Sequence, residues 1–124
     1  MSSQVKIFFD GGCRPGGMET AVVIAGKAYV RRDLGPGTGM EAEWLALIQA
    51  AGLARELGLI DPQFVGDSLA VVNQANGVAK CRGDAIRHLE TFRALVPAAG
   101  APRIRHIKRS QNLAGIALAR LHDR

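Results

Sequence analysis

Three carboxylic acids stand at positions where they could do acid–base or metal chemistry. Asp10 and Asp67 each end an apolar, strand-like run beside a glycine, and Glu43 lies early in a predicted helix next to Trp44. Acids at strand ends beside flexible loops occupy the place where open α/β sheets bind ligands. For either aspartate alone, a role as a turn former or helix cap is the more ordinary interpretation. The third acid, Glu43, favours a functional cluster.

Glu43 has to be distinguished from its neighbour Glu41. Thr38 followed by Glu41 three residues later has the form of a capping box, which explains Glu41. Two residues turn a helix by about 200°, so Glu43 points away from Glu41. The cap therefore gives Glu43 no role, and another explanation is needed for it.

A cluster of these three acids would need a cation, because neighbouring carboxylates repel one another and raise each other's pKa. Oxygen ligands without cysteine or histidine favour Mg²⁺ or Mn²⁺. Two such ions about 4 Å apart can activate a water and stabilise the leaving oxygen in phosphodiester cleavage. We expect Asp10, Glu43 and Asp67 to be both the metal ligands and the catalytic groups, with two ions of Mg²⁺ or Mn²⁺.

The charge of the chain points to the same kind of substrate. It has 16 basic and 11 acidic residues, for a net charge of +5. Such a balance favours a polyanionic partner, of which nucleic acid is the most usual. A basic protein with an acidic metal site has the properties that a nuclease needs.

Length and composition limit the alternatives. The chain of 124 residues fits a single domain, and 48% hydrophobic with 22% charged residues is typical of a globular protein. No apolar run approaches the roughly 18 residues that cross a bilayer, and the N-terminal sequence lacks the pattern of a signal peptide. We expect a monomeric cytoplasmic protein with no membrane partner, in which Cys13 and Cys81 are reduced thiols.

The predicted elements alternate in a way that places the acids at strand ends. The first strand ends at Asp10-Gly11-Gly12 and is followed by a broad turn, and Ser110 is expected to cap the last helix. The predicted strands are Val5–Phe9, Thr20–Ala25, Lys27–Arg32, Phe64–Val65 and Arg103–Lys108, the broad turn is Gly11–Gly17, and the predicted helices are Met40–Leu57, Ser68–Asn76, Asp84–Val96 and a last one through His122. This order predicts an α/β domain with a mixed sheet: three strands are followed by a helix, a strand, two helices, a strand and a last helix.

Four segments, taken together, resemble type 1 ribonuclease H in family order and at family spacing over nearly the whole chain. They are FFDGG (Phe8–Gly12), TGMEAEWLALIQA (Thr38–Ala50), GDSLAVVNQANG (Gly66–Gly77) and IKRSQNLAGIALA (Ile107–Ala119). The resemblance implies one RNase H-like domain over residues 1–124, with a five-stranded mixed sheet whose first three strands are antiparallel, flanked by helices. It also implies endonucleolytic cleavage of the RNA strand of RNA/DNA hybrids, leaving 5′-phosphate and 3′-hydroxyl ends.

The resemblance assigns roles to individual residues. Asp10, Glu43 and Asp67 match the first three acids of the family site, and Thr38 matches a threonine that contacts a DNA-strand phosphate. Gly39-Met40 stand where the family has two asparagines that help to read the RNA strand, so backbone groups would have to serve there. The implied nucleic-acid-binding residues are Gly11, Gly12, Cys13, Arg14, Thr38, Gly39, Met40, Asn73, Arg109 and Asn112.

The clearest departure from the family is at its fourth acid. Asn112, Leu118 and Ala119 keep their places in the last motif, but Ile116 occupies the acid position. We expect Ile116 to pack in the core on one face with Leu113, Ala117 and Leu121. Asp123 lies seven residues further on, about 10 Å along a helix axis, which is too far to replace the missing ligand.

Other departures concern the substrate grip and the histidines. The segment Gly77–Asp84 is too short for the extra basic helix of some family members, which indicates a compact form. His106 is either a strand residue or the match of a histidine that assists product release in some members, and His88 and His122 are expected to be solvated. Basic residues that could partly replace the missing helix, or simply be surface charges, are Arg14, Lys80, Arg82, Lys108 and Arg109.

Three functions therefore stay open. The first is a divalent-metal ribonuclease H that works with three acids. The second is a catalytically weak or inactive RNase H-like module that binds nucleic acid, since the fourth acid is missing. The third is a nuclease of the same superfamily that acts on another substrate, such as structured DNA, because Gly39-Met40 differ from the family.

Overall fold

The computed structural model describes residues 4–97 and 103–122, which leaves the first three residues of the N-terminal sequence and Asp123 outside it. The strands are β1 (Val5–Arg14), β2 (Gly17–Ile24), β3 (Lys27–Arg31), β4 (Pro62–Gly66) and β5 (Arg105–His106). The helices are α1 (Gly39–Glu56), α2 (Leu69–Ala75), α3 (Asp84–Leu95) and α4 (Leu113–Leu121), with a 3₁₀ turn η1 at Arg109–Gln111.

The strands form one mixed sheet in the order β3-β2-β1-β4-β5. Strands β1, β2 and β3 pair antiparallel through short hairpins, whereas β4 pairs parallel to β1 and β5 parallel to β4. The predicted mixed sheet with three antiparallel strands is thereby confirmed. Since β1 lies in the centre, its residues are within reach of elements on both faces.

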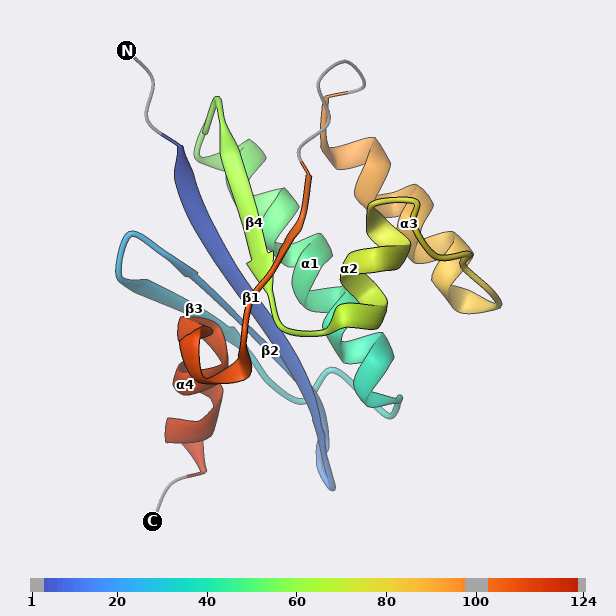
Figure 1. Cartoon of the computed structure of the whole chain (residues 1–124). Coiled ribbons are helices and arrows are strands. Elements are labelled where there is room, and N and C mark those ends of the chain that lie inside the picture. Colours follow the sequence, from blue (N-terminus) through green and yellow to red (C-terminus); the bar gives the residue numbers. More distant parts are fainter. Residues whose placement is uncertain (1–3, 98–102, 123–124) are drawn as a thin grey trace.

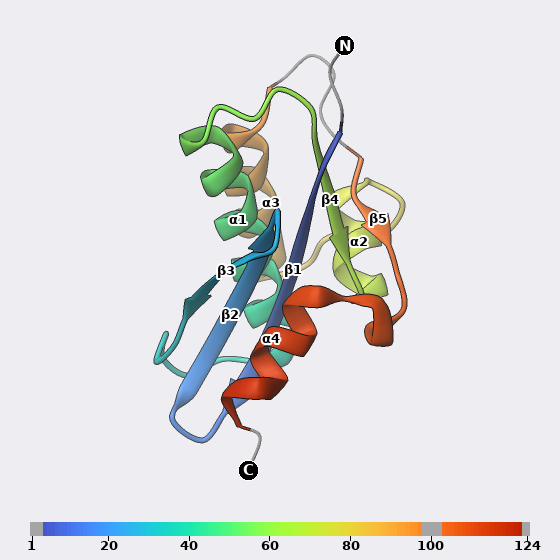
Figure 2. The ribbon, with the colours of Figure 1, turned by 90° about the vertical axis from the view of Figure 1, so that its left-hand side faces the viewer.

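Helices cover the sheet unequally. Figures 1 and 2 show α1, α2 and α3 on one face and α4 alone on the other. The larger apolar core lies under α1, where Ile7, Phe9, Trp44 and Phe64 are fully or almost fully buried. A smaller apolar cluster under α4 contains Ala21, Val23, Ala114 and Leu118.

Alternation along β1 explains how one strand serves both faces. Successive side chains of a strand point to opposite sides, so Ile7 and Phe9 enter the core under α1 while Phe8 packs under α4. Asp10 follows Phe9 and therefore lies on the α4 side. The first catalytic candidate is thus placed at the centre of the sheet by the apolar pattern that precedes it.

Gly11 allows α1 to approach β1 unusually closely. A Cβ atom at this position would lie 2.2 Å from the carbonyl oxygen of Ala42 and 2.7 Å from the backbone nitrogen of Glu43. Only a residue without a side chain fits between the strand and the start of this helix. This contact brings Glu43 to the level of Asp10.

The structure corrects the predicted end of the first strand. Strand β1 continues through Asp10 to Arg14, because residues 10–14 pair in register with residues 17–21 of β2. The predicted broad turn over Gly11–Gly17 is therefore wrong, and only Pro15-Gly16 turn the chain. Glycine-rich composition indicated a loop, but antiparallel pairing with β2 satisfies the backbone of this segment.

Two further boundaries near the C-terminus differ from expectation. The cap of α4 is Asn112, whose side chain accepts a hydrogen bond from the Ala114 backbone N–H, whereas Ser110 lies within η1. Strand β5 covers two residues only, so the predicted strand Arg103–Lys108 is too long. Asparagine satisfies a free helix N–H as well as serine does, and the sequence contains both within three residues.

Within residues 4–97 and 103–122, every helix is too short or too polar to span a membrane.

Replacing Gly11 with alanine is expected to lower the free energy of unfolding by about 1–3 kcal/mol, the usual cost of overpacking, because the new methyl group meets the backbone of α1. Denaturant unfolding of Gly11→Ala would measure it. Gly12→Ala is the matched control, because a Cβ atom there meets nothing within 4 Å. Equal stabilities of the two variants would contradict this packing argument.

Candidate active site

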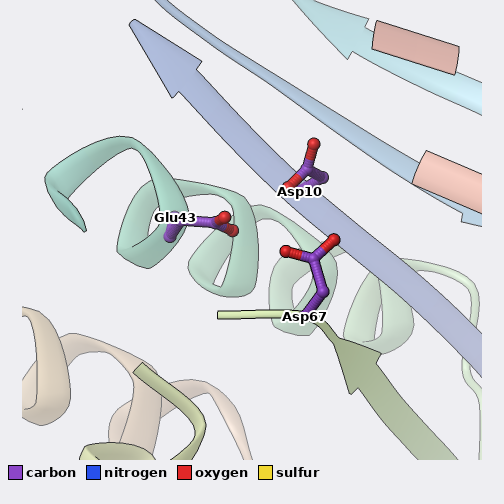
Figure 3. Close-up of side chains that lie close together, drawn as sticks. All are labelled: Asp10, Glu43 and Asp67. Atoms are coloured by element: carbon purple, nitrogen blue, oxygen red, sulfur yellow. The ribbon is translucent and has the colours of Figure 1, made fainter. Parts of the chain in front are cut away.

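The structure brings together the three acids that the sequence singled out. Asp10 comes from the middle of β1, Glu43 from the second turn of α1 and Asp67 from the residue after β4. One carboxylate oxygen of each lies within 4.8 Å of the others. Figure 3 shows the three side chains pointing toward one another from these separate elements.

Hydrogen bonds from the surrounding chain fix two of the carboxylates. The Gly11 backbone N–H donates to Glu43 Oε1 at 3.2 Å. The Asn112 side chain, which is fully buried, donates to Asp67 Oδ2 and to the Phe9 carbonyl, each at 2.9 Å. Because Asn112 also caps α4, one residue connects the start of that helix, the central strand and the third acid.

Burial and nearby negative charge make Asp10 and Glu43 reluctant to ionise. Burial is the main cause that raises the pKa of Asp10 to about 6, and the charge of Asp67 adds to it. Burial also raises the pKa of Glu43 to about 9, with further contributions from the charge of Asp10 and from a hydrogen bond to it. Arg109 opposes the shift at Asp10 but does not cancel it.

The residues present fit a divalent cation. All three donors are carboxylate oxygens, the ligands that Mg²⁺ and Mn²⁺ prefer. Within the described residues, none of the three forms an ion pair with a lysine, arginine or histidine side chain. An ion would supply the positive charge that the raised pKa values show to be lacking.

The fourth-acid position lies at the same cavity but carries no acid. Ile116 lines a cavity of about 440 Å³ with Asp10, Glu43 and Gly115. Its side chain is 38% exposed, so the expected packing of Ile116 in the core is wrong. The buried face of α4 instead carries Ala114 and Leu118, one helical turn apart.

Gly115 gives the acids further room beside α4. A Cβ atom there would lie 3.3 Å from Asp10 Oδ2 and 3.8 Å from Asp67 Oδ2. The helix backbone itself therefore borders the cluster. Asp123, weighed as a replacement ligand, lies outside the described residues.

Only part of the predicted nucleic-acid-binding set lies at this cavity. Its lining includes Gly11, Gly12, Cys13, Arg14 and Arg109. Asn112 reaches the cluster through Asp67. The rest of the set is elsewhere: Thr38 caps α1 at 3.1 Å from the Glu41 backbone nitrogen, Met40 lines a separate hollow with Thr38, Gly39 begins α1, and Asn73 lies in α2.

The three histidines occupy different environments. His88 is buried, stacks on Trp44 and lies 3.4 Å from Glu41 Oε2, so its predicted solvation is wrong. His122 is also not simply solvated, because its Nε2 lies 2.7 Å from Glu19 Oε2. His106 is an exposed residue of β5 whose Nε2 lies 3.2 Å from the Asp67 carbonyl oxygen.

Sequence reasoning missed Glu19, which also lines the cavity. It is 3% exposed, which is rare for a carboxylate. The available signal was an acid directly before the apolar run Thr20–Ala25. That signal was weak, because the segment before this run was predicted to be a turn.

The sheet order, the helices on its two faces and the acids at its centre define an RNase H-like fold. A family profile described as reverse transcriptase-like matches residues 22–122, and the chain therefore belongs to this family. The matched region includes Glu43, Asp67 and α4 but begins after Asp10. A comparison with curated proteins finds no match.

Solved structures of ribonucleases H have the same fold. RNase H1 from the halophilic archaeon Halobacterium salinarum matches with a TM-score of 0.84 and 27% identity, over 98% of this chain and 100% of that one. The N-terminal RNase H domain of a Mycobacterium tuberculosis protein matches with a TM-score of 0.74 and 26% identity, over 94% and 95%. LC11-RNase H1 from compost, solved in complex with RNA/DNA hybrid, matches with a TM-score of 0.77 and 25% identity, over 92% of each chain.

Without metal, the protein is expected to lose stability as the pH rises. Folding raises the pKa of Asp10 from 3.8 to about 6 and that of Glu43 from 4.5 to about 9. The folded state therefore holds more protons than the unfolded state between about pH 4 and pH 9, and the free energy of unfolding falls across this window. In chelator, the melting temperature should be lower at pH 8.5 than at pH 5.

Asp10→Asn should make this profile shallower without abolishing it, because burial still raises the pKa of Glu43. It should raise the melting temperature at pH 8.5 by about 4 °C for each kcal/mol regained. Added Mg²⁺ should stabilise the parent protein but not this variant. Glu90→Gln, which removes an exposed acid of α3, is the control and should follow the parent. A parent protein whose melting temperature increases from pH 5 to pH 8.5 in chelator would refute the assigned electrostatics.

Proposed function

We propose that this protein is a ribonuclease H that cuts the RNA strand of RNA/DNA hybrids. The observation that carries the proposal is the convergence of Asp10, Glu43 and Asp67 on one point of an RNase H-like fold. Membership of the reverse transcriptase-like family and likeness to RNase H1 structures, one of them in complex with hybrid, support it. The expected products carry 5′-phosphate and 3′-hydroxyl ends.

The three acids would hold two ions of Mg²⁺ or Mn²⁺. When bound, such ions lower the pKa of a bound water and stabilise the charge on the leaving oxygen. The Gly11 N–H holds Glu43 and the Asn112 side chain holds Asp67, so these two carboxylates would need little reorganisation when cations bind.

The walls of the cavity would orient the substrate. Arg14 and Arg109 lie at the same cavity as Asp10 and offer positive charge to the strand on either side of the reacting phosphate. Gly12, where a Cβ atom would meet nothing within 4 Å, allows the backbone of β1 to approach the sugar–phosphate chain closely. We also propose that the protein acts as a monomer in the cytoplasm.

A second candidate function is an RNase H-like module that binds nucleic acid without cutting it. The observation that favours it is Ile116, an apolar side chain at the cavity in the position of the fourth acid. In this case hybrid binding would be sensitive to salt, and neither Mg²⁺ nor Mn²⁺ would support turnover.

Asp10→Asn is expected to reduce hybrid cleavage by more than about 100-fold. Loss of a residue that only hydrogen-bonds to a metal ligand costs up to about 100-fold, and loss of a ligand itself should cost more. The amide keeps the size of the side chain but supplies no charge for the cation. Cleavage of a labelled hybrid in Mg²⁺ measures the rate, and circular dichroism checks the fold. Cleavage at the parent rate would show that Asp10 is not a ligand.

Ile116→Asp is expected to raise the cleavage rate about tenfold or more, because it adds a carboxylate at the cavity wall beside Asp10. Leu113→Asp is the control, since it places the same charge on α4 at a residue of similar exposure that does not line the cavity. If the two variants change the rate equally, the gain is not due to a fourth ligand.

A further inference from the structure

Among the residues that the structure describes, Glu19 is the least exposed ionisable residue, and it lies on the α4 side of the sheet. It lies in β2 directly opposite Gly12 of β1 and is 3% exposed. Three basic groups converge on it: His122 Nε2 at 2.7 Å, Arg14 Nε at 3.6 Å and Arg32 Nε at 3.7 Å. A carboxylate so far from water is stable only when such partners compensate it.

The two arginines approach different oxygens of this carboxylate and remain half exposed. Arg14 lies at Oε2 and Arg32 at Oε1, with 48% and 52% of their side chains accessible. Nε is the nitrogen that each ion pair joins to Glu19, and because both side chains are about half accessible, their guanidinium groups can still meet a second anion. Two guanidinium groups on one carboxylate leave at least one net positive charge, and such groups suit the oxygens of a phosphate.

This cluster is continuous with the acidic site. Arg14 and Glu19 line the same cavity as Asp10 and Glu43. Between Asp10 and Arg14 on this face of β1 stands only Gly12, where a Cβ atom would meet nothing within 4 Å. Four residues of strand span about 13 Å, the length of a few nucleotides.

We propose that Arg14 and Arg32, held by the two oxygens of Glu19, form a binding site for a backbone phosphate of the strand that enters the acidic site. The inference rests on the proposed function for the identity of that strand, and it differs from the contact expected at Thr38, which lies in another hollow. Glu19 is a positioning residue that acts through the two arginines.

Two explanations of the role of Glu19 predict opposite effects of Glu19→Gln on the affinity for hybrid: Glu19 acts only through its charge, or it positions the two arginines. Removing a negative charge beside a polyanion should tighten binding if Glu19 acts only through the electrostatic field. If Glu19 holds the arginines in place, the same change frees their side chains, and binding should weaken. The sign of the change in affinity therefore separates the two explanations.

The test is the fluorescence anisotropy of a short labelled RNA/DNA hybrid, titrated with protein in chelator over a range of salt concentrations. Arg14→Ala and Arg32→Ala should each weaken binding roughly tenfold at low salt and reduce the slope of log affinity against log salt by about 1. Arg31→Ala is the matched control: it removes the same charge from the neighbouring residue of β3, whose side chain points to the opposite face of the sheet. Its effect should stay within about twofold.

Glu19→Gln should weaken hybrid binding about threefold, since the charges of both arginines remain. It should raise KM for cleavage without changing kcat, and it should have no further effect in the Arg14→Ala/Arg32→Ala double variant. Glu90→Gln serves as the control for loss of one acid. Tighter binding by Glu19→Gln, or equal losses for Arg31→Ala and Arg32→Ala, would overturn the proposal.

The outcomes also separate this inference from the proposed function. If the variants show these binding effects but the parent protein cuts no hybrid, the phosphate site is supported and the proposed activity is wrong. If the Arg14→Ala/Arg32→Ala double variant cuts hybrid with an unchanged KM, only the proposed phosphate site is wrong. If the parent protein does not bind hybrid at all, the inference is overturned. If Glu19→Gln does not fold, the comparison of Arg32→Ala with Arg31→Ala decides.

Discussion

The backbone contact between Gly11 and the start of α1 is the constraint on which the site depends. With no side chain at Gly11, the helix approaches until the Gly11 N–H reaches Glu43 Oε1 at 3.2 Å. Ala42 is fully buried at this contact, so neither element can move without the other. Glu43 is thereby held against Asp10 on the central strand, and Asn112 holds Asp67 from the opposite face of the sheet.

The electrostatic character of the site follows from this geometry. Burial and nearby negative charge oppose the ionisation of Asp10 and Glu43, and the pKa values of both are raised. The same arrangement is favourable once cations are present, because the repulsion becomes attraction to a shared charge. Arg109 and Arg14 line the same cavity, and in the proposed function they would neutralise the charge of the nucleic acid strand beside the metal site.

Much of the fold could be predicted from the sequence, because the spacing of apolar residues and the glycines between predicted elements are local signals. Helix α1 follows from the spacing of Trp44 and Leu47, and the hairpin from β2 to β3 follows from Gly26. The extension of β1 through Gly11–Arg14 could not be read locally, since pairing with β2 decides it. The exposure of Ile116 depends likewise on how α4 lies on the sheet, and the burial of Glu19 on residues distant in sequence, Arg32 and His122.

The proposed function requires that three acids suffice for a hydrolytic site that selects RNA paired with DNA. Its most direct test is cleavage of one labelled RNA strand, presented as RNA/DNA hybrid and as double-stranded RNA, with double-stranded DNA alongside, in Mg²⁺ and in Mn²⁺. We predict cutting of the hybrid alone, dependent on the metal, with 5′-phosphate and 3′-hydroxyl ends. Binding of the hybrid without any cutting in either metal would contradict it.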